Sequence, residues 1–101
     1  MGNIYEEYLM EWEGIPLTLH LKRHFSSAIE QLYGYELVHV KVRAGERLPT
    51  TETGFRSLFL SMQRLTEAGG LVAFVQAWLD DSAQLTQWQE YLQTQQQLNL
   101  F

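Results

Sequence analysis

Cysteine is absent from the sequence. Its absence excludes a disulfide framework, a thiol nucleophile and any zinc site built on cysteine. Hydrophobic residues make up 46% of the 101 residues and aromatic residues 13%, so a core can form without covalent or metal links. The length suits one domain and is too short for two. We therefore expect a single domain held together by its own hydrophobic core.

Long hydrophobic runs are also missing. No apolar segment approaches the roughly 20 residues that a membrane-spanning helix needs. The first residues carry Glu6, Glu7 and Glu11 where a signal peptide would carry lysine or arginine. We expect a cytoplasmic protein that does not associate with membranes.

Basic residues are scarce, with seven Lys or Arg against twelve Asp or Glu. The resulting net charge of −5 argues against direct nucleic-acid binding, which needs clustered cations. All seven basic residues lie between positions 22 and 64, where four acids leave a net charge of +3. This segment could form a mildly basic face, although such a charge run more often marks a solvated sheet surface.

Two alternating segments predict a hairpin. Apolar residues recur at every second position before and after Glu13 and Gly14, and this pair suits a two-residue turn because glycine accepts a positive φ. The expected register pairs Trp12 with Ile15, Met10 with Leu17, Tyr8 with Leu19 and Glu7 with His20. A slip of one residue would expose the apolar set, so this register is well specified.

The next elements are a short helix and a third strand. Ser26 or Ser27 offers an N-cap, Glu30 could complete a capping box, and Gly34 ends a helix over 28–33. In a strand over 35–43, valines alternate with polar residues. Glycine, proline and threonine then indicate a loop over 44–54.

From Phe55 onward the apolar spacing is helical. One amphipathic run ends at Gly69 and Gly70, a second follows from Leu71, and the acidic residues at 80–81 could separate it from a third. We expect an α+β fold, a three-stranded antiparallel sheet (β-β-α-β) covered on one face by two or three C-terminal helices. The domain would occupy 1–93, and a C-terminal peptide tail would occupy 94–101.

The densest polar cluster lies in the segment 50–57. Glu52, Thr53 and Arg56 could together form a second functional surface and hold a ligand. A loop of this composition more often caps the helix that follows it, and we favour the cap.

Candidates for chemistry are weak. His20, His39 and Glu7 could gather on one face of the sheet, but a cross-strand Glu–His pair on a wet surface is common, so we predict no metal site. No serine has a nucleophile-elbow context, and no phosphate-binding loop is present. We predict no catalytic residues, no cofactor and no enzymatic activity.

Several aromatic side chains could stack bases, as in proteins that bind single strands. A number of them alternate with core positions, which favours the core instead. The residues concerned are Tyr5, Tyr8, Trp12, Tyr33 and Tyr35.

The chain ends with Gln97, Leu98, Asn99, Leu100 and Phe101. This segment resembles the peptide, Gln-Leu-Ser/Asp-Leu-Phe in its best form, by which bacterial polymerases and repair proteins bind the β sliding clamp. Four of the five positions match, and Asn99 is small and polar like the residue it replaces. The resemblance implies a protein–protein contact in which the three apolar side chains enter a groove of the clamp. Alternatively, these side chains complete the packing of the domain itself.

The blocks 48–57 and 68–80 are similar to small uncharacterised proteins of plasmids and other mobile elements. With the C-terminal peptide, this resemblance predicts a bacterial, non-enzymatic protein that binds the sliding clamp and modulates replication or repair. The alternative is a small homodimeric or ligand-binding module with a structural tail.

Overall fold

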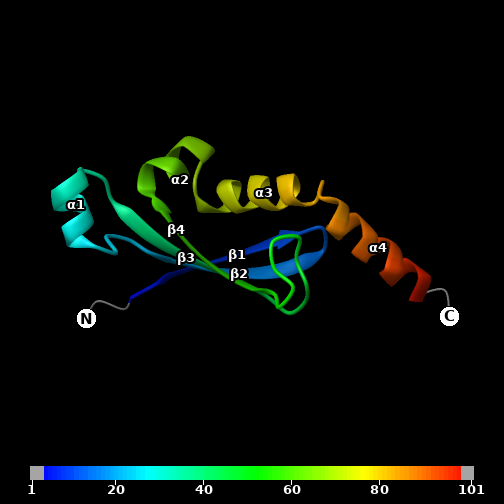
Figure 1. Ribbon diagram of the computed structural model, residues 1–101. Coiled ribbons are helices and arrows are strands. Elements are labelled where there is room, and N and C mark those ends of the chain that lie inside the picture. The colour runs from blue at the N-terminus through cyan, green and yellow to red at the C-terminus, as the bar shows by residue number, and fades with distance from the viewer. Residues whose placement is uncertain (1–3, 99–101) are drawn as a thin grey trace.

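The computed structural model describes the backbone of residues 4–98 and the side chains of residues 4–95. An antiparallel sheet in the order β1-β2-β3-β4 carries helices that come mostly from the C-terminal half of the chain (Figure 1). The elements are β1 (Glu6–Trp12), β2 (Ile15–Lys22), α1 (Ser27–Tyr33), β3 (Leu37–Ala44), β4 (Phe55–Ser61), α2 (Met62–Ala68), α3 (Leu71–Ser82) and α4 (Thr86–Leu98). The α+β class is confirmed, but the sheet has four strands and not three.

The fourth strand replaces the predicted start of a helix. β4 pairs antiparallel with β3, so that Val38 lies opposite Leu60 and Val40 opposite Leu58. Leu58 and Leu60 face the core, whereas Phe55 and Phe59 lie on the other face of the strand. Because apolar residues lie on both faces of the strand, their spacing in the sequence resembles that of an amphipathic helix. In so short a run, periodicity alone does not distinguish a strand from a helix. Pairing with β4 also satisfies the second edge of β3, which the three-stranded prediction left without a partner.

The hairpin of β1 and β2 has the predicted register. Trp12 pairs with Ile15 and Met10 with Leu17, and Glu7 lies opposite His20. Glu13 and Gly14 both have positive φ, 50° and 79°. Two successive positive values define a type I′ turn, whose twist matches that of the flanking strands.

The short helix and the third strand also agree with the sequence, apart from one detail. Ser26 caps α1 by accepting a hydrogen bond from the amide of Ile29, and Gly34 ends the helix with φ 77°. Glu30 does not complete a capping box, because with Ser26 as N-cap the N3 position belongs to Ile29; the Glu30 carboxylate instead lies 2.7 Å from His24 Nδ1. In β3 the alternating valines at 38, 40 and 42 are fully buried.

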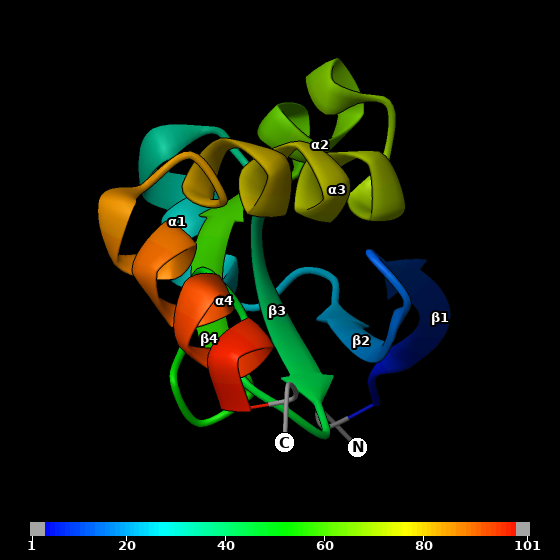
Figure 2. The same ribbon diagram turned by 90° about the vertical axis from the view of Figure 1, so that its right-hand side faces the viewer.

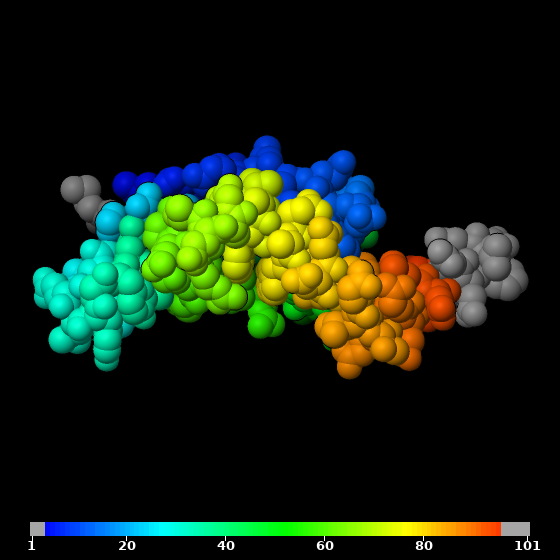
Figure 3. All heavy atoms as spheres, turned by 90° about the horizontal axis from the view of Figure 1, so that it is seen from above, coloured from blue at the N-terminus to red at the C-terminus, as the bar shows by residue number. Residues whose placement is uncertain are grey.

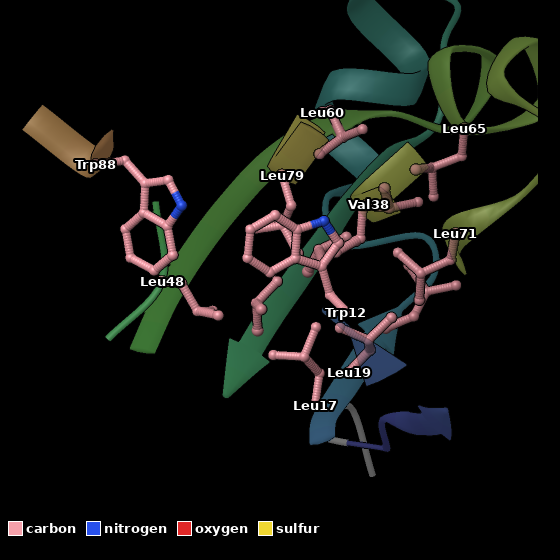
Figure 4. Packing of buried hydrophobic residues seen from close by; sticks show 14 residues of the cluster. Trp12, Leu17, Leu19, Val38, Leu48, Leu60, Leu65, Leu71, Leu79 and Trp88 are labelled. Atoms are coloured by element: carbon pink, nitrogen blue, oxygen red, sulfur yellow. The ribbon is translucent and has the colours of Figure 1, made fainter. Parts of the chain in front are cut away.

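Helices α2 and α3 lie over one face of the sheet (Figure 1, Figure 2). α3 ends at Ser82 and α4 begins at Thr86, so the predicted break between two helices is present and closely follows the acidic residues at 80–81. In the core between the two layers, Trp12 lies beside Leu79 while Trp88 sits at the margin (Figure 4). The buried hydrophobic residues are Trp12, Leu17, Leu19, Leu21, Val38, Val40, Val42, Leu48, Leu60, Leu65, Leu71, Val75, Leu79 and Trp88.

Candidate functional site

The predicted clamp-binding peptide begins in the last turn of α4. The backbone of Gln97 and Leu98 is helical, and Asn99, Leu100 and Phe101 lie outside the described residues. α4 extends past the end of the sheet that carries the hairpin turn, at the opposite end of the molecule from α1 (Figure 1, Figure 3). Its final turn is thereby directed away from the sheet.

The first half of α4 anchors it to the domain. The Trp88 side chain is buried, and its ring centroid lies 6.0 Å from that of Trp12 and 5.2 Å from that of Tyr91. The guanidinium of Arg47 lies 4.5 Å above the Tyr91 ring. Beyond Tyr91, Leu92 is 38% exposed, and the described side chains that follow it, at 93–95, are all polar. The apolar stripe that could have run on into the C-terminal peptide therefore weakens before the peptide begins.

A groove of about 700 Å³ runs between the hairpin turn and α4. Its walls include Trp12, Trp88 and Tyr91, with the carboxylate of Asp80 among them. That carboxylate already accepts hydrogen bonds from Trp12 Nε1 at 2.8 Å and from Gln76 Nε2 at 3.1 Å. At the wall of the groove, Asp80 therefore joins β1 to α3.

The cluster Glu52, Thr53 and Arg56 does not converge on one point. Glu52 forms an ion pair with Arg47 at 3.6 Å. The Thr53 and Thr51 hydroxyls bond to the carbonyl of Phe55, so the threonines fix the entry into β4, and the predicted helix cap is wrong. Arg56 lies on β4 opposite Val42, and no hydrogen bond or ion pair in the described chain joins it to Glu52 or Thr53.

The face of the sheet opposite α2 and α3 carries aromatic and basic side chains that the sequence prediction did not combine into a site. We call this surface the open face. Cross-strand pairing places Lys22, His39 and Phe59 in one row, Lys41 and Ser57 in the next, and Arg43 and Phe55 in a third. Phe25, just before α1, and Tyr5, just before β1, lie against its first row. The open face thus combines residues from 5 to 59.

His39 is the centre of an aromatic cluster on the open face. Its imidazole stacks on the Phe59 ring, with centroids 4.4 Å apart and planes 14° apart. The Phe25 ring lies 5.3 Å from His39 and 5.1 Å from Phe59. The two ring nitrogens of His39 are satisfied by hydroxyls, Nδ1 by Tyr5 at 2.8 Å and Nε2 by Ser57. A neutral imidazole meets both contacts with one donor and one acceptor, so the ring is fixed in orientation.

Acidification is expected to destabilise the fold through His39. Burial lowers the pKa of His39 below its ordinary value of 6.5, and the charges of Lys41 and Lys22 lower this pKa further. The neutral ring contributes to the free energy of unfolding, and this contribution is fully present above pH 6.5. It is lost as the pH falls through the native pKa, because the unfolded chain takes up a proton more readily than the native ring does. The melting temperature should therefore fall less between about pH 7.5 and about pH 5.5 in His39→Gln than in the unsubstituted chain. An equal fall in both proteins would contradict this assignment.

The other candidate ligands for a metal do not assemble. His20 Nε2 lies 3.2 Å from Glu7 Oε2 in the cross-strand pair expected from the hairpin register. Within the part of the chain that the structure describes, no three His, Asp or Glu side chains are grouped to hold a metal ion. In the same part, no helix has the length and apolar character needed to cross a membrane.

Two signals in the sequence could have revealed the open face. The alternation of His39, Lys41 and Arg43 with buried valines placed these three on the solvent side of β3. Phe55 and Phe59 were the missing element, because the prediction of a helix assigned them to the core. Of the aromatic residues expected in the core, Trp12 is buried, whereas Tyr33 and Tyr35 are exposed.

Comparison with known proteins places most of the chain in a family. The family model described as KlcB third domain matches residues 5–88. This range contains the whole sheet, α1 to α3 and the Trp88 anchor of α4, and it ends before the C-terminal peptide. No curated protein and no solved structure matches the chain.

Proposed function

We propose that this chain, which belongs to the KlcB third-domain family and so is related to a plasmid-borne protein, is a non-enzymatic interaction protein. It would bind the bacterial DNA polymerase sliding clamp through residues 97–101. The observation that carries the proposal is the sequence Gln97, Leu98, Asn99, Leu100, Phe101 at the end of a helix that leaves the domain. The family match supports a mobile-element origin, and the peptide lies beyond the matched residues.

The residue types of the peptide suit a groove on another protein. Leu98, Leu100 and Phe101 can each contribute roughly 1.5–3 kcal/mol when their side chains are buried. Gln97 carries both an amide donor and a carbonyl acceptor, so it can fix the register of the peptide at the edge of a groove. Ordering the peptide and losing rigid-body freedom offset much of this gain, so we expect a binding free energy of about −8 kcal/mol, near the micromolar range.

The position of α4 adds to this argument. Its anchor at Trp88 and Tyr91 fixes the helix, and its later turns extend beyond the sheet. A partner that approaches the end of α4 from outside meets little of the remaining domain. Tethering would concentrate the domain at replicating DNA in the cytoplasm, where it would modulate replication or repair.

Calorimetric titration of the purified chain with a bacterial sliding clamp tests the proposal. The double substitution Leu100→Ala, Phe101→Ala removes two apolar anchors and should weaken binding by at least about 100-fold. Gln93→Ala is the matched control, because Gln93 is exposed on α4 but lies outside the peptide. Absence of heat with the unsubstituted chain, or equal affinity in the double variant, would refute the proposal.

A further inference from the structure

We propose that the open face binds single-stranded nucleic acid, with bases stacked on its rings and phosphates beside its cations. This departs from the expectation of no direct nucleic-acid contact, which rested on the net charge of the whole chain. It is also independent of the C-terminal peptide, since the residues concerned lie on β2, β3, β4, the segment before α1 and the position just before β1.

The rings of the open face are arranged to receive bases. His39 and Phe59 stand side by side on neighbouring strands with their planes nearly parallel. His39 covers one face of the Phe59 ring, and β4 is an edge strand, so the second ring face is directed over the free edge of the sheet. Phe59 is 57% exposed. A base placed on that second face would continue the stack, and stacking of this kind tolerates any base.

A second ring lies further along the same strand. Phe55 is on the same face of β4 as Phe59, four residues away, which is about 13 Å along a strand. Phe55 is 40% exposed. Two exposed rings on one edge strand offer stacking positions for separate nucleotides of an extended strand.

The cations of the open face are held at the level of the rings. Lys41 Nζ lies 4.3 Å from the centre of the Tyr5 ring, Lys22 Nζ lies 5.0 Å from that of Phe25, and the Arg43 guanidinium lies 5.4 Å from that of Phe55. Each cation therefore lies over one face of an aromatic ring. A nucleotide has the same pairing of a flat base and an anionic phosphate, so this arrangement complements it in both charge and shape.

Six of the twelve acidic residues are placed away from Phe55 and Phe59 by the elements that carry them. On the open face, Glu7 and Glu11 belong to β1, at the opposite edge of the sheet from β4, and Glu7 is paired with His20. The four acids after residue 64 all lie in the helices, three of them on α3 and α4. The net charge of −5 is thus an average, and the surface of β2, β3 and β4 is locally basic.

A single strand fits this surface better than a duplex does. The aromatic rings can stack only on bases whose faces are accessible, and in a duplex these faces are covered. Three cations also neutralise few phosphates, so affinity would depend on stacking as well as on charge.

Fluorescence anisotropy of the full chain with labelled oligothymidylate, oligouridylate and a DNA duplex tests the inference. Binding should be strongest for a single strand, and the slope of log K against log salt concentration should be about −2 for three neutralised phosphates. Phe59→Ala should weaken binding by about five- to 100-fold. Lys41→Gln should reduce the slope by about 0.7. A preference between the two oligonucleotides would identify DNA or RNA as the partner.

Two variants on the other side of the molecule serve as matched controls. Arg64→Gln removes a cation from α2, and Leu85→Ala removes a 55% exposed apolar side chain between α3 and α4. Neither should change the affinity for the oligonucleotides, and melting curves will show that every variant is folded. Absence of binding at low salt, or equal affinity for the duplex, would overturn the inference. Equal affinity for polyglutamate, an anionic chain without bases, or equal effects of the control variants would overturn it as well. The clamp titration is unaffected by any of these outcomes.

Discussion

Replacing Trp12 by alanine is expected to lower the free energy of unfolding by about 3–5 kcal/mol. Trp12 is 2% exposed and joins three elements. Its ring packs beside Trp88 of α4 at 6.0 Å, and its Nε1 donates a hydrogen bond to Asp80 of α3 at 2.8 Å. The substitution removes one of the two tryptophan side chains of the core and leaves a cavity between the hairpin and the helices. Chemical denaturation followed by circular dichroism measures the change.

Two further variants separate packing from hydrogen bonding at this position. Trp12→Phe retains an aromatic ring but loses the donor to Asp80, so it should cost less than Trp12→Ala. Asp80→Ala leaves the Trp12 ring in place but removes the acceptor of the indole N–H and that of the exposed hydrogen bond from the Gln76 amide, and it should cost about 1–2 kcal/mol, mainly because the indole N–H is left without its partner. If Trp12→Ala costs less than about 1 kcal/mol, the hairpin is not fixed to α3 and α4 in the manner described.

Replacing Gly54 by alanine is expected to cost about 2–4 kcal/mol. Gly54 is buried with φ +80°, and a Cβ there would lie 2.7 Å from the carbonyl oxygen of Ala44 and 2.8 Å from that of Glu46. Both obstacles are backbone atoms, which cannot rotate away. The same residue accepts the hydrogen bond from the Ala44 amide at 2.7 Å that closes the loop between β3 and β4. A shift of this loop would therefore disturb the start of β4 and with it Phe55.

Gly14→Ala is the matched control for Gly54→Ala. Gly14 has nearly the same φ, +79°, but no atom lies within 4 Å of the position that a Cβ would occupy. It should show only the cost of a left-handed residue, about 1–2 kcal/mol. Equal losses of stability in the two variants would mean that the contacts around Gly54 are not as close as described.

The hairpin could be predicted because every local signal agreed. Its alternation, its turn residues and the burial of one face all specify the same register, and only that register hides Leu17 and Leu19. β4 could not be predicted, because the choice between strand and helix depended on a partner far away in sequence. Residues 55–61 form a strand because they pair with β3, where Val40 lies opposite Leu58. This pairing exists only in the folded chain, so the sequence alone does not reveal it.

The open face could not be predicted either, because its prediction requires β4. With Phe55 and Phe59 assigned to a helix, His39, Lys41 and Arg43 formed only the polar side of one strand. Once β4 pairs with β3, the same residues lie beside two exposed rings. The C-terminal peptide is the opposite case, since it depends on a linear motif that can be read from the sequence alone.

The central claim, that residues 97–101 bind a foreign groove, is tested most directly by a chain that ends at Gln96. Clamp binding and the melting temperature should be measured on the same preparation of this protein. We predict that the truncated chain gives no heat with the clamp and melts within a degree or two of the full chain. A truncated chain that still binds the clamp, or that loses many degrees of thermal stability because the removed residues belong to the core, would contradict the claim.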